Sequence, residues 1–347
     1  MKFNFKSIKS RNRPYFIAEA GVNHECSISM AKKIIDKAKN AGADAIKFQT
    51  YKANKIAAKI SPYYWDIKKE KTKSQYQLFS KYDHFNYKDY KLLSGYCKKK
   101  KIEFLSTPFD SNAVDFLYPL VNIYKISSSD ITNYPLLEKV SSKGKPVILS
   151  TGASTVKEIR NALKIINKKV KKVILMHCIL NYPTQNKNAN LNMIRFLRDE
   201  FPHCIPGYSD HTLPNKDMSN LITAFFMGAK VIEKHFTLNK RFKGNDHYHS
   251  LDEKDLKNFN NKLDKILPTL GEYKKRFIKS EIKSRKNARR SLVLNLNLKK
   301  GHKLKFDDLI PKRPATGISP IHIKKILGKR LKRNLLSDTI LQWKHIS

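Results

Sequence analysis

The sequence predicts an α/β protein, a (β/α)8 TIM barrel followed by a small second domain. Short runs rich in β-branched and aromatic residues alternate with segments whose apolar residues recur every three to four positions. Alternating strands and helices form a parallel sheet, and eight such units over about 240 residues match a barrel better than an open sheet. No GxGxxG motif follows any run, which argues against a dinucleotide-binding sheet.

Each predicted strand is a short run bounded by turn or polar residues. In chain order the runs are YFIAEAG (15–21), AIKFQTY (45–51), IEFLSTPF (102–109), NIYKISSSD (122–130), PVILSTGAS (146–154), VILMHCILNYP (173–183), CIPGYSD (204–210) and KVIEKHFT (230–237). Amphipathic helical segments lie between most of them, for example Ser29 to Ala43. The helix within 154–169 begins with Ser154 or Thr155 as its N-cap, and Glu158 is placed for a capping box. A last helical region spans 251–271.

One interruption of this pattern, from Tyr51 to Asp83, is too long for a simple loop and is rich in aromatic residues. Long loops in compact domains are usually functional lids or disordered segments. The aromatic density favours a structured lid.

The composition changes after the last helical region. The basic stretch EYKKRFIKSEIKSRKNARR (272–290) is followed by short β-like runs and turns. We therefore expect a barrel domain at 1–271, a linker at 272–285 and a small domain at 286–347. A domain of about 60 residues is marginally stable alone, so it should gain stability by packing on something else.

The charge balance is strongly positive, with 70 Lys and Arg against 29 Asp and Glu, a formal net charge of +41. Such an excess suggests a nucleic acid, membrane phosphate or an anionic substrate. The positive residues are mostly lysines scattered on presumed helix faces beside abundant Asn and Ile, which fits the compositional bias of an AT-rich genome. Lys98 to Lys101 fall where a helix should end, which suits the helix dipole. The stretch 272–290 is the only candidate patch for nucleic acid and carries no known reader motif, so we expect no such partner.

Four cysteines, Cys26, Cys97, Cys178 and Cys204, show neither CxxC spacing nor the density of a disulfide framework. The N-terminal residues carry positive charge without the apolar region of a signal peptide. No apolar run approaches the roughly 20 residues that span a bilayer. We expect a soluble, cytoplasmic protein that does not act at a membrane.

Polar residues end nearly every predicted strand. In a barrel the carboxyl ends of the strands meet on one face, where active sites lie. The residues delivered there are Glu19, Lys47, Gln49, Thr107, Lys125, Ser128, Asp130, Ser150, Thr151, Asn181, Tyr182, Ser209, Asp210, His211, Glu233 and His235. Lys47 and Lys125 lie inside otherwise apolar runs, and burial of an ammonium group is costly without a compensating anion. Two lysines with several hydroxyl groups point to a phosphate or carboxylate ligand.

Two histidines close neighbouring strands. His211 and His235 lie one βα unit apart, so they should be neighbours on the barrel rim and within reach of one metal ion. Two imidazoles leave coordination positions open for water and substrate, as a catalytic metal site requires. Two ordinary rim histidines remain the alternative interpretation.

A series of motifs resembles the N-acetylneuraminate (sialic acid) synthase family, with its legionaminic and pseudaminic acid relatives. In order along nearly the whole chain they are FIAEAGVNHE, AIKFQTY, FLSTPFD, YKISSSDITNYPLL, PVILSTGAS, LMHCILNYPT, GYSDHT, VIEKHFT and KRPATGISP. The resemblance implies a TIM barrel followed by an antifreeze-like (SAF) domain, in a homodimer whose small domain caps the partner's active site. It implies a transferase that condenses phosphoenolpyruvate with an open-chain N-acylated hexosamine, giving a nine-carbon 2-keto sugar acid and phosphate.

The resemblance also implies roles for individual residues. His211 and His235 would hold a divalent ion, manganese or magnesium, that polarises the aldehyde of the sugar. Glu19 would orient or activate the attacking water. The positions that cradle phosphoenolpyruvate match Lys47, Thr107, Lys125, Ser128, Ser150 and Ser209, and those that contact the sugar match Gln49, Asp130, Tyr182 and Asp246. Arg313 of one chain looks like the arginine that reaches the N-acyl group in the other chain's site.

Three departures from the family pattern affect the choice of sugar. Asp130 stands where many relatives have Glu, Leu180 where some have a small polar residue, and Arg289 with Arg290 where some carry an aromatic residue. The acceptor is therefore left open among N-acetylmannosamine, its 6-phosphate and deoxy diacetamido sugars. Other classes fit less well: a polyanion-binding protein lacks a reader motif, an inert carbohydrate-binding barrel has no need of buried lysines, and metal-dependent hydrolases usually have more His and Asp ligands.

Overall fold

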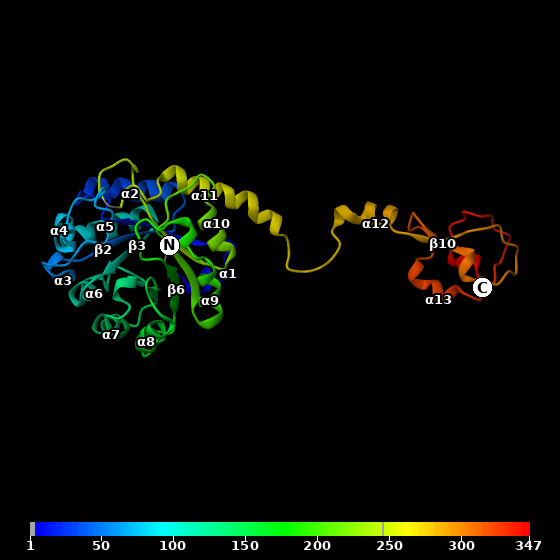
Figure 1. Cartoon of the computed structure of the whole chain (residues 1–347), viewed down its shortest axis with the longest axis horizontal. Coiled ribbons are helices and arrows are strands. Elements are labelled where there is room, and N and C mark those ends of the chain that lie inside the picture. Colours follow the sequence, from blue (N-terminus) through cyan, green and yellow to red (C-terminus); the bar gives the residue numbers. More distant parts are fainter. Residues whose placement is uncertain (1–3, 245) are drawn as a thin grey trace. The chain divides into compact units, whose positions relative to one another are not determined.

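The computed structural model describes residues 4–244 and 246–347, and the chain divides into two compact units, Met1–Leu270 and Gly271–Ser347. In the first unit, helices surround a set of central strands (Figure 1). The second unit is small and has a core of its own. The predicted barrel and small domain are both present.

All eight predicted strands of the barrel form, and every recorded pair among them is parallel. They are β1 (Tyr15–Gly21), β2 (Ala45–Thr50), β3 (Glu103–Pro108), β4 (Tyr124–Ile126), β5 (Val147–Ser150), β6 (Val173–Cys178), β7 (Ile205–Asp210) and β8 (Val231–His235). Their order in the sheet is β3-β2-β1-β8-β7-β6-β5-β4, and the two end strands pack against each other. The sheet is thus a nearly closed barrel, as the alternating pattern predicts.

The helices of the first unit follow the amphipathic segments. They are α1 (Phe5–Ser10), α2 (Ile28–Asn40), α3 (Ala53–Ile56), α4 (Gln75–Lys81), α5 (Tyr87–Lys100), α6 (Ser111–Leu117), α7 (Tyr134–Ser142), α8 (Val156–Ile166), α9 (Asn192–Glu200), α10 (Ser219–Phe226) and α11 (Glu253–Ile266). Thr155 is the N-cap of α8 and forms the predicted capping box with Glu158, because its hydroxyl satisfies a backbone N–H that the first turn leaves free. The lysine run ends α5, as expected, and Lys101 adopts a left-handed conformation there.

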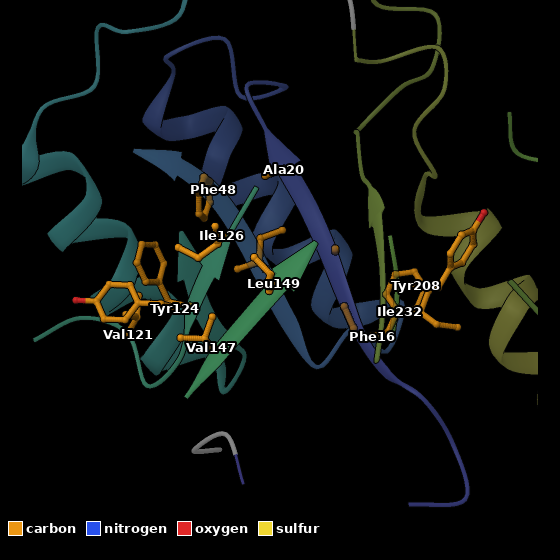
Figure 2. Close-up of a cluster of buried hydrophobic side chains, with 14 of the residues drawn as sticks. Phe16, Ala20, Phe48, Val121, Tyr124, Ile126, Val147, Leu149, Tyr208 and Ile232 are labelled. Carbon is orange, nitrogen blue, oxygen red and sulfur yellow. The ribbon is translucent and has the colours of Figure 1, made fainter. Parts of the chain in front are cut away.

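Alternation along the strands builds two apolar layers. Inside the barrel, Ile17, Leu105, Ile148 and Val231 belong to one buried cluster. Outside it, Phe16, Leu149, Tyr208 and Ile232 face the surrounding helices, and Figure 2 shows these side chains among the strands. Side chains alternate along a strand, so every second residue points into the barrel, and we call these residues the inner row of the strand. At the carboxyl ends of the strands the residues of the inner rows are polar.

The long aromatic segment after β2 is ordered, as the sequence predicts. Trp65 is 5 % exposed and its indole Nε1–H donates to the carbonyl of Glu70 at 3.1 Å. A β-bridge joins Pro62 to Ser74 just before α4. The segment therefore presents a fixed wall and not an open loop.

The second unit contains α12 (Ile282–Ala288), β9 (Ser291–Leu294), β10 (Leu309–Lys312) and α13 (Ile323–Ile326). The two strands pair antiparallel. Leu292, Leu304, Ile326 and Leu341 are among the buried residues of its core. In the part of the chain that the structure describes, no helix is long and apolar enough to cross a bilayer.

Candidate active site

The polar ends of the inner rows enclose one cavity of about 380 Å³ at the carboxyl face of the barrel. Its lining combines basic, acidic, hydroxyl and imidazole groups. The residues are Glu19, Lys47, Gln49, Thr107, Phe109, Lys125, Ser127, Ser128, Ser150, Cys178, Tyr182, Ser209, His211, Glu233 and His235. Glu19 follows Ile17 by two positions and Lys125 follows Ile123 by two, so strand alternation directs these groups inward.

Two buried lysines and two buried carboxylates form a network inside this cavity. Lys47 Nζ lies 2.5 Å from Glu19 Oε2 and 3.7 Å from Glu233 Oε1. Lys125 Nζ lies 3.0 Å from the same oxygen of Glu233. Lys47 also donates to Thr107 Oγ1 at 3.1 Å. The carboxylates supply the compensation that buried ammonium groups need in the free protein.

The network separates the pKa values of its two carboxyl groups. Burial raises the pKa of Glu19 to about 7, although Lys47 opposes the shift. Burial would also raise the pKa of Glu233, but the charges of Lys125 and Lys47 outweigh it and lower the pKa to about 2. Burial likewise opposes the charge of Lys47, yet its two carboxylate neighbours raise its pKa. Glu233 is therefore a fixed negative charge, whereas Glu19 can exchange a proton near neutral pH.

Hydroxyl groups complete a subsite suited to an anion. Three buried serines line the cavity: Ser128 just after β4, Ser150 at the end of β5 and Ser209 near the end of β7. Ser209 Oγ donates to Glu233 Oε1 at 3.3 Å, whereas Ser150 Oγ is buried and has no hydrogen-bond partner among the described residues. A buried hydroxyl without a partner costs free energy unless a ligand supplies one. Two ammonium groups with nearby hydroxyls match a phosphate or carboxylate.

His211 and His235 end the adjacent strands β7 and β8, and their ring centroids lie 5.8 Å apart. The Nδ1–H of His211 donates to the carbonyl of Ile179 at 2.7 Å, which leaves the lone pair on Nε2. Burial lowers the pKa of His211 to about 4 and that of His235 well below its usual value. Both rings are therefore neutral near pH 7, the form that binds a metal ion.

The surroundings of His235 also suit a bound ion. Its Nδ1 is buried without a hydrogen-bond partner, 3.6 Å from Asp246 Oδ2. Gly21 has a φ of +51°, and a Cβ there would lie 3.3 Å from Asp246 Oδ2 and 3.5 Å from His235 Nδ1, so glycine keeps this space free. Among the described residues, no group of three or more His, Cys, Asp or Glu side chains is arranged to hold a metal ion. The nitrogen donors that the cavity offers to an ion are the two neutral imidazoles of His211 and His235, which would leave its other positions open to water and substrate.

A second cavity of about 560 Å³ adjoins the first, and the two share Gln49, Tyr182 and His235. Its other lining residues are Val22, Tyr64, Leu78, Phe79, Tyr82 and Asp246. Gln49 Nε2 donates to Glu19 Oε1 at 3.0 Å, so the amide connects the two cavities. Apolar walls with a few polar groups are typical of a site for a small organic ligand.

Family models agree with this architecture. The model of the NeuB family matches residues 34–275, and the SAF domain model matches residues 289–347. The chain belongs to the NeuB family. It is therefore a synthase of the sialic-acid type, a condensing enzyme of the transferase class, and the resemblance seen in the motifs is confirmed.

Relatives whose names state an activity align with this chain over almost its whole length. It is 39% identical over 340 residues to an N,N'-diacetyllegionaminic acid synthase of Legionella pneumophila, which covers 96% of this chain and 94% of that protein. It is 39% identical over 332 residues to the Campylobacter jejuni protein of the same name, covering 94% and 98% of the two chains. The crystal structure of a Leptospira borgpetersenii N-acetylneuraminic acid synthetase in complex with citrate matches with a TM-score of 0.68 and 34% identity, covering 79% of this chain and 90% of that one.

Most of the site residues that the NeuB-family motifs indicate line one of the two cavities. The strand-end and motif candidates that lie outside both cavities are Asp130, Thr151, Asn181, Asp210 and Arg313. Asp130 lines neither cavity, and its Oδ1 instead accepts a hydrogen bond from Asn133 Nδ2 at 3.0 Å. Arg313 is exposed on the second unit.

Sequence reasoning did not single out several lining residues. Tyr64, Phe79 and Tyr82 come from the aromatic segment after β2, where aromatic density was the only signal. Cys178 ends β6 on the inner row, and strand alternation would have found it. His249 is fully buried, and its ring centroid lies 5.0 Å from that of His235.

Proposed function

We propose that the protein condenses phosphoenolpyruvate with the aldehyde of an open-chain N-acylated amino sugar, yielding a nine-carbon 2-keto sugar acid and phosphate. The observation that carries the proposal is the juxtaposition of a lysine-lined cavity and a second cavity at two neutral histidines. A reaction between an anion and an aldehyde needs one subsite for each reactant, and the two subsites must adjoin so that the reacting carbons come close together.

Phosphoenolpyruvate fits the first cavity. Lys47 and Lys125 would bind its phosphate and carboxylate, with hydroxyl groups as further donors. Those donors are Thr107, Ser128, Ser150 and Ser209. Before the substrate arrives, the buried carboxylates Glu19 and Glu233 pair with Lys47 and Lys125, so the two side chains are not buried without a partner.

His211 and His235 would hold a manganese or magnesium ion. When bound, this ion would act as a Lewis acid on the carbonyl of the sugar. The hydrogen bond from His211 to Ile179 would fix the orientation of that ring. Gln49, Tyr182 and Asp246 line the acceptor cavity and would position the sugar so that its aldehyde faces the enol carbon.

Glu19 would handle protons and water at the reacting carbon. When the methylene carbon C3 of phosphoenolpyruvate attacks the aldehyde carbon, C2 becomes cationic and accepts water. The tetrahedral intermediate at C2 then loses phosphate and leaves the 2-keto group. Glu19 lies between Lys47 and Gln49 at the junction of the cavities, where it can take a proton from that water. Its raised pKa suits this task near neutral pH.

We propose a diacetamido 6-deoxy sugar as the first acceptor to test, ahead of N-acetylmannosamine and its 6-phosphate. Two relatives that are 39% identical to this chain are N,N'-diacetyllegionaminic acid synthases. Val22, Leu78 and Phe79 in the acceptor cavity offer apolar contacts to a methyl group and to N-acyl groups.

A panel of the three sugars, each assayed with phosphoenolpyruvate for phosphate release, tests this function. We expect the largest kcat/KM with the diacetamido sugar, and loss of turnover after chelation. If no sugar releases phosphate from phosphoenolpyruvate at any added manganese concentration, the proposed reaction is wrong. If N-acetylmannosamine is preferred, only the choice of acceptor is wrong.

The pKa of Glu19 predicts a pH dependence. A carboxyl group is protonated below its pKa and a base must be unprotonated, so kcat/KM for phosphoenolpyruvate should rise with pH through about 7 and level off above it. Glu19→Gln should remove this rise and lower the rate about 10²- to 10⁴-fold. A pH–rate profile that keeps the same rise in Glu19→Gln would contradict the assignment.

We propose that the enzyme is a homodimer in which Arg313 of the small domain reaches the N-acyl group in the other chain's site. Arg313 is exposed and offers a planar set of donors to an amide carbonyl. In the full chain, Arg313→Ala should raise KM for the sugar about tenfold, the loss expected for one hydrogen bond from a charged group. Lys324→Ala, at another exposed position of the same unit, is the control. Sedimentation tests the dimer, and a fully active monomer would overturn this arrangement.

A further inference from the structure

A buried ion pair lies directly behind the two histidines. Asp210 and Lys234 are Cα partners in the parallel pairing of β7 with β8, and each immediately precedes one of the histidines. Side chains alternate along a strand, so His211 and His235 line the inner cavity whereas Asp210 and Lys234 point outward, beneath the helical layer. Both charged side chains are 1% exposed, and their Nζ and Oδ2 atoms lie 2.7 Å apart.

The carboxylate of Asp210 is fully engaged. Its Oδ1 accepts from the Tyr208 hydroxyl and from the backbone N–H of Thr212, each at 2.9 Å. Its Oδ2 accepts from Thr212 Oγ1 at 3.1 Å in addition to Lys234. The carboxylate is therefore held by residues of both β7 and β8.

Lys234 contacts the residues on both sides of His211. Its ammonium group also donates to the carbonyl of Thr212 at 2.6 Å. Residues on both sides of His211 are thus tied to the residue that precedes His235. The backbone carbonyl of His211 accepts from the N–H of Thr184 at 2.8 Å, so the main chain at this position is held from a third direction.

Stability alone does not explain this arrangement. A buried ion pair is often no more stabilising than well-packed apolar residues of similar volume, because desolvation offsets the attraction. What the pair supplies is a fixed register between two strand ends, since a slip or splay of either strand would break several charge-assisted hydrogen bonds together.

We propose that the Asp210–Lys234 pair is a positioning device that sets the separation of His211 and His235 and thereby the affinity of the protein for its divalent ion. The proposal rests on the metal role of these histidines in the proposed function. Neither Asp210 nor Lys234 lines either cavity, so in this proposal they act through the backbone that carries the histidines. Outer contacts of this kind typically change metal affinity about 10- to 100-fold when they are removed.

The test is a neutral double variant, Asp210→Asn/Lys234→Met, which leaves no uncompensated charge in the interior. Titration calorimetry of metal-free full-length protein with manganese should show Kd increased about 10-fold or more. Phosphoenolpyruvate binding without metal should change less than twofold, because Lys47 and Lys125 lie on β2 and β4 and, of the four hydroxyl donors, only Ser209 lies on β7. A merely structural role would weaken both.

The matched control is Arg11→Met/Asp44→Asn, which neutralises a partly buried ion pair with an N–O distance of 2.8 Å at the opposite end of the strands. It should leave manganese affinity unchanged. Equal weakening in both double variants, or wild-type affinity in a folded Asp210→Asn/Lys234→Met, would overturn the proposal. If the wild type itself binds no manganese, the metal assignment is wrong and the inference falls with it, an outcome distinct from the other two.

Thr212→Val serves if the double variant does not fold. It removes the hydrogen bond from Thr212 Oγ1 to Asp210, together with one that Thr212 Oγ1 accepts from Asn220, and leaves the ion pair in place. We expect a smaller increase in the Kd for manganese, again without a change in phosphoenolpyruvate binding. Unchanged manganese affinity in this variant would count against the positioning role.

Discussion

Replacement of His235 by alanine is expected to lower kcat/KM about 10³-fold or more, because it removes one of the two imidazoles that would hold the ion and with it several kcal/mol of carbonyl polarisation. The fold should persist, since His235 ends β8 at the rim and its Nδ1 makes no hydrogen bond that the barrel would lose. Phosphate release, manganese titration and thermal melting of His235→Ala check the three parts of this prediction.

A matched control for this variant is His203→Ala. His203 is exposed just before β7, outside both cavities, and its removal should change neither manganese affinity nor turnover. Substantial activity of His235→Ala in the presence of added manganese would contradict the metal assignment.

Replacement of Lys125 by methionine is expected to have the second largest effect. It leaves the buried Glu233 carboxylate with Lys47 at 3.7 Å as its remaining cation. Breaking a buried pair from one side typically lowers the free energy of unfolding by about 3 to 5 kcal/mol. Phosphoenolpyruvate should also bind about 10- to 100-fold more weakly, the loss expected when hydrogen bonds to a charged group are removed.

The double variant Lys125→Met/Glu233→Gln separates these two effects. Neutralising Glu233 removes the uncompensated charge, so denaturant unfolding should show most of the lost stability recovered. Phosphoenolpyruvate binding, measured by calorimetry, should remain weak because the ammonium group is still missing. Wild-type affinity in the double variant would contradict a substrate role for Lys125.

The fold and much of the candidate site follow from local patterns. A period of two in eight runs and a period near 3.6 between them specify strands and helices, and their alternation specifies a parallel barrel. Once the barrel is known, the inner row of each strand must end on one face. For this reason Lys47, Lys125, His211 and His235 could be grouped before any contact was known.

Other features depend on which residues meet across the chain. Asp130 lies in the 3-10 turn Ser128–Asp130 that follows β4, and its carboxylate accepts a hydrogen bond from Asn133, the N-cap of α7, so it lines neither cavity. The hydrophobic periodicity of the sequence does not predict that turn. Likewise, the aromatic density of the segment after β2 predicts a structured lid but does not single out Tyr64 and Phe79 as residues that line the acceptor cavity.

The sequence by itself determined the barrel, the NeuB-family motifs and the set of polar groups at its carboxyl face, because these depend on side-chain period and residue type. Only the tertiary structure decided that Glu233 bridges towards both lysines, that Glu19 acquires a pKa near neutrality, and that Asp210 pairs with Lys234 behind the histidines. The physical reason is that electrostatic interactions depend on separation in space and on burial. Lys125 and Glu233, for example, are 108 positions apart in the chain and 3.0 Å apart in the fold.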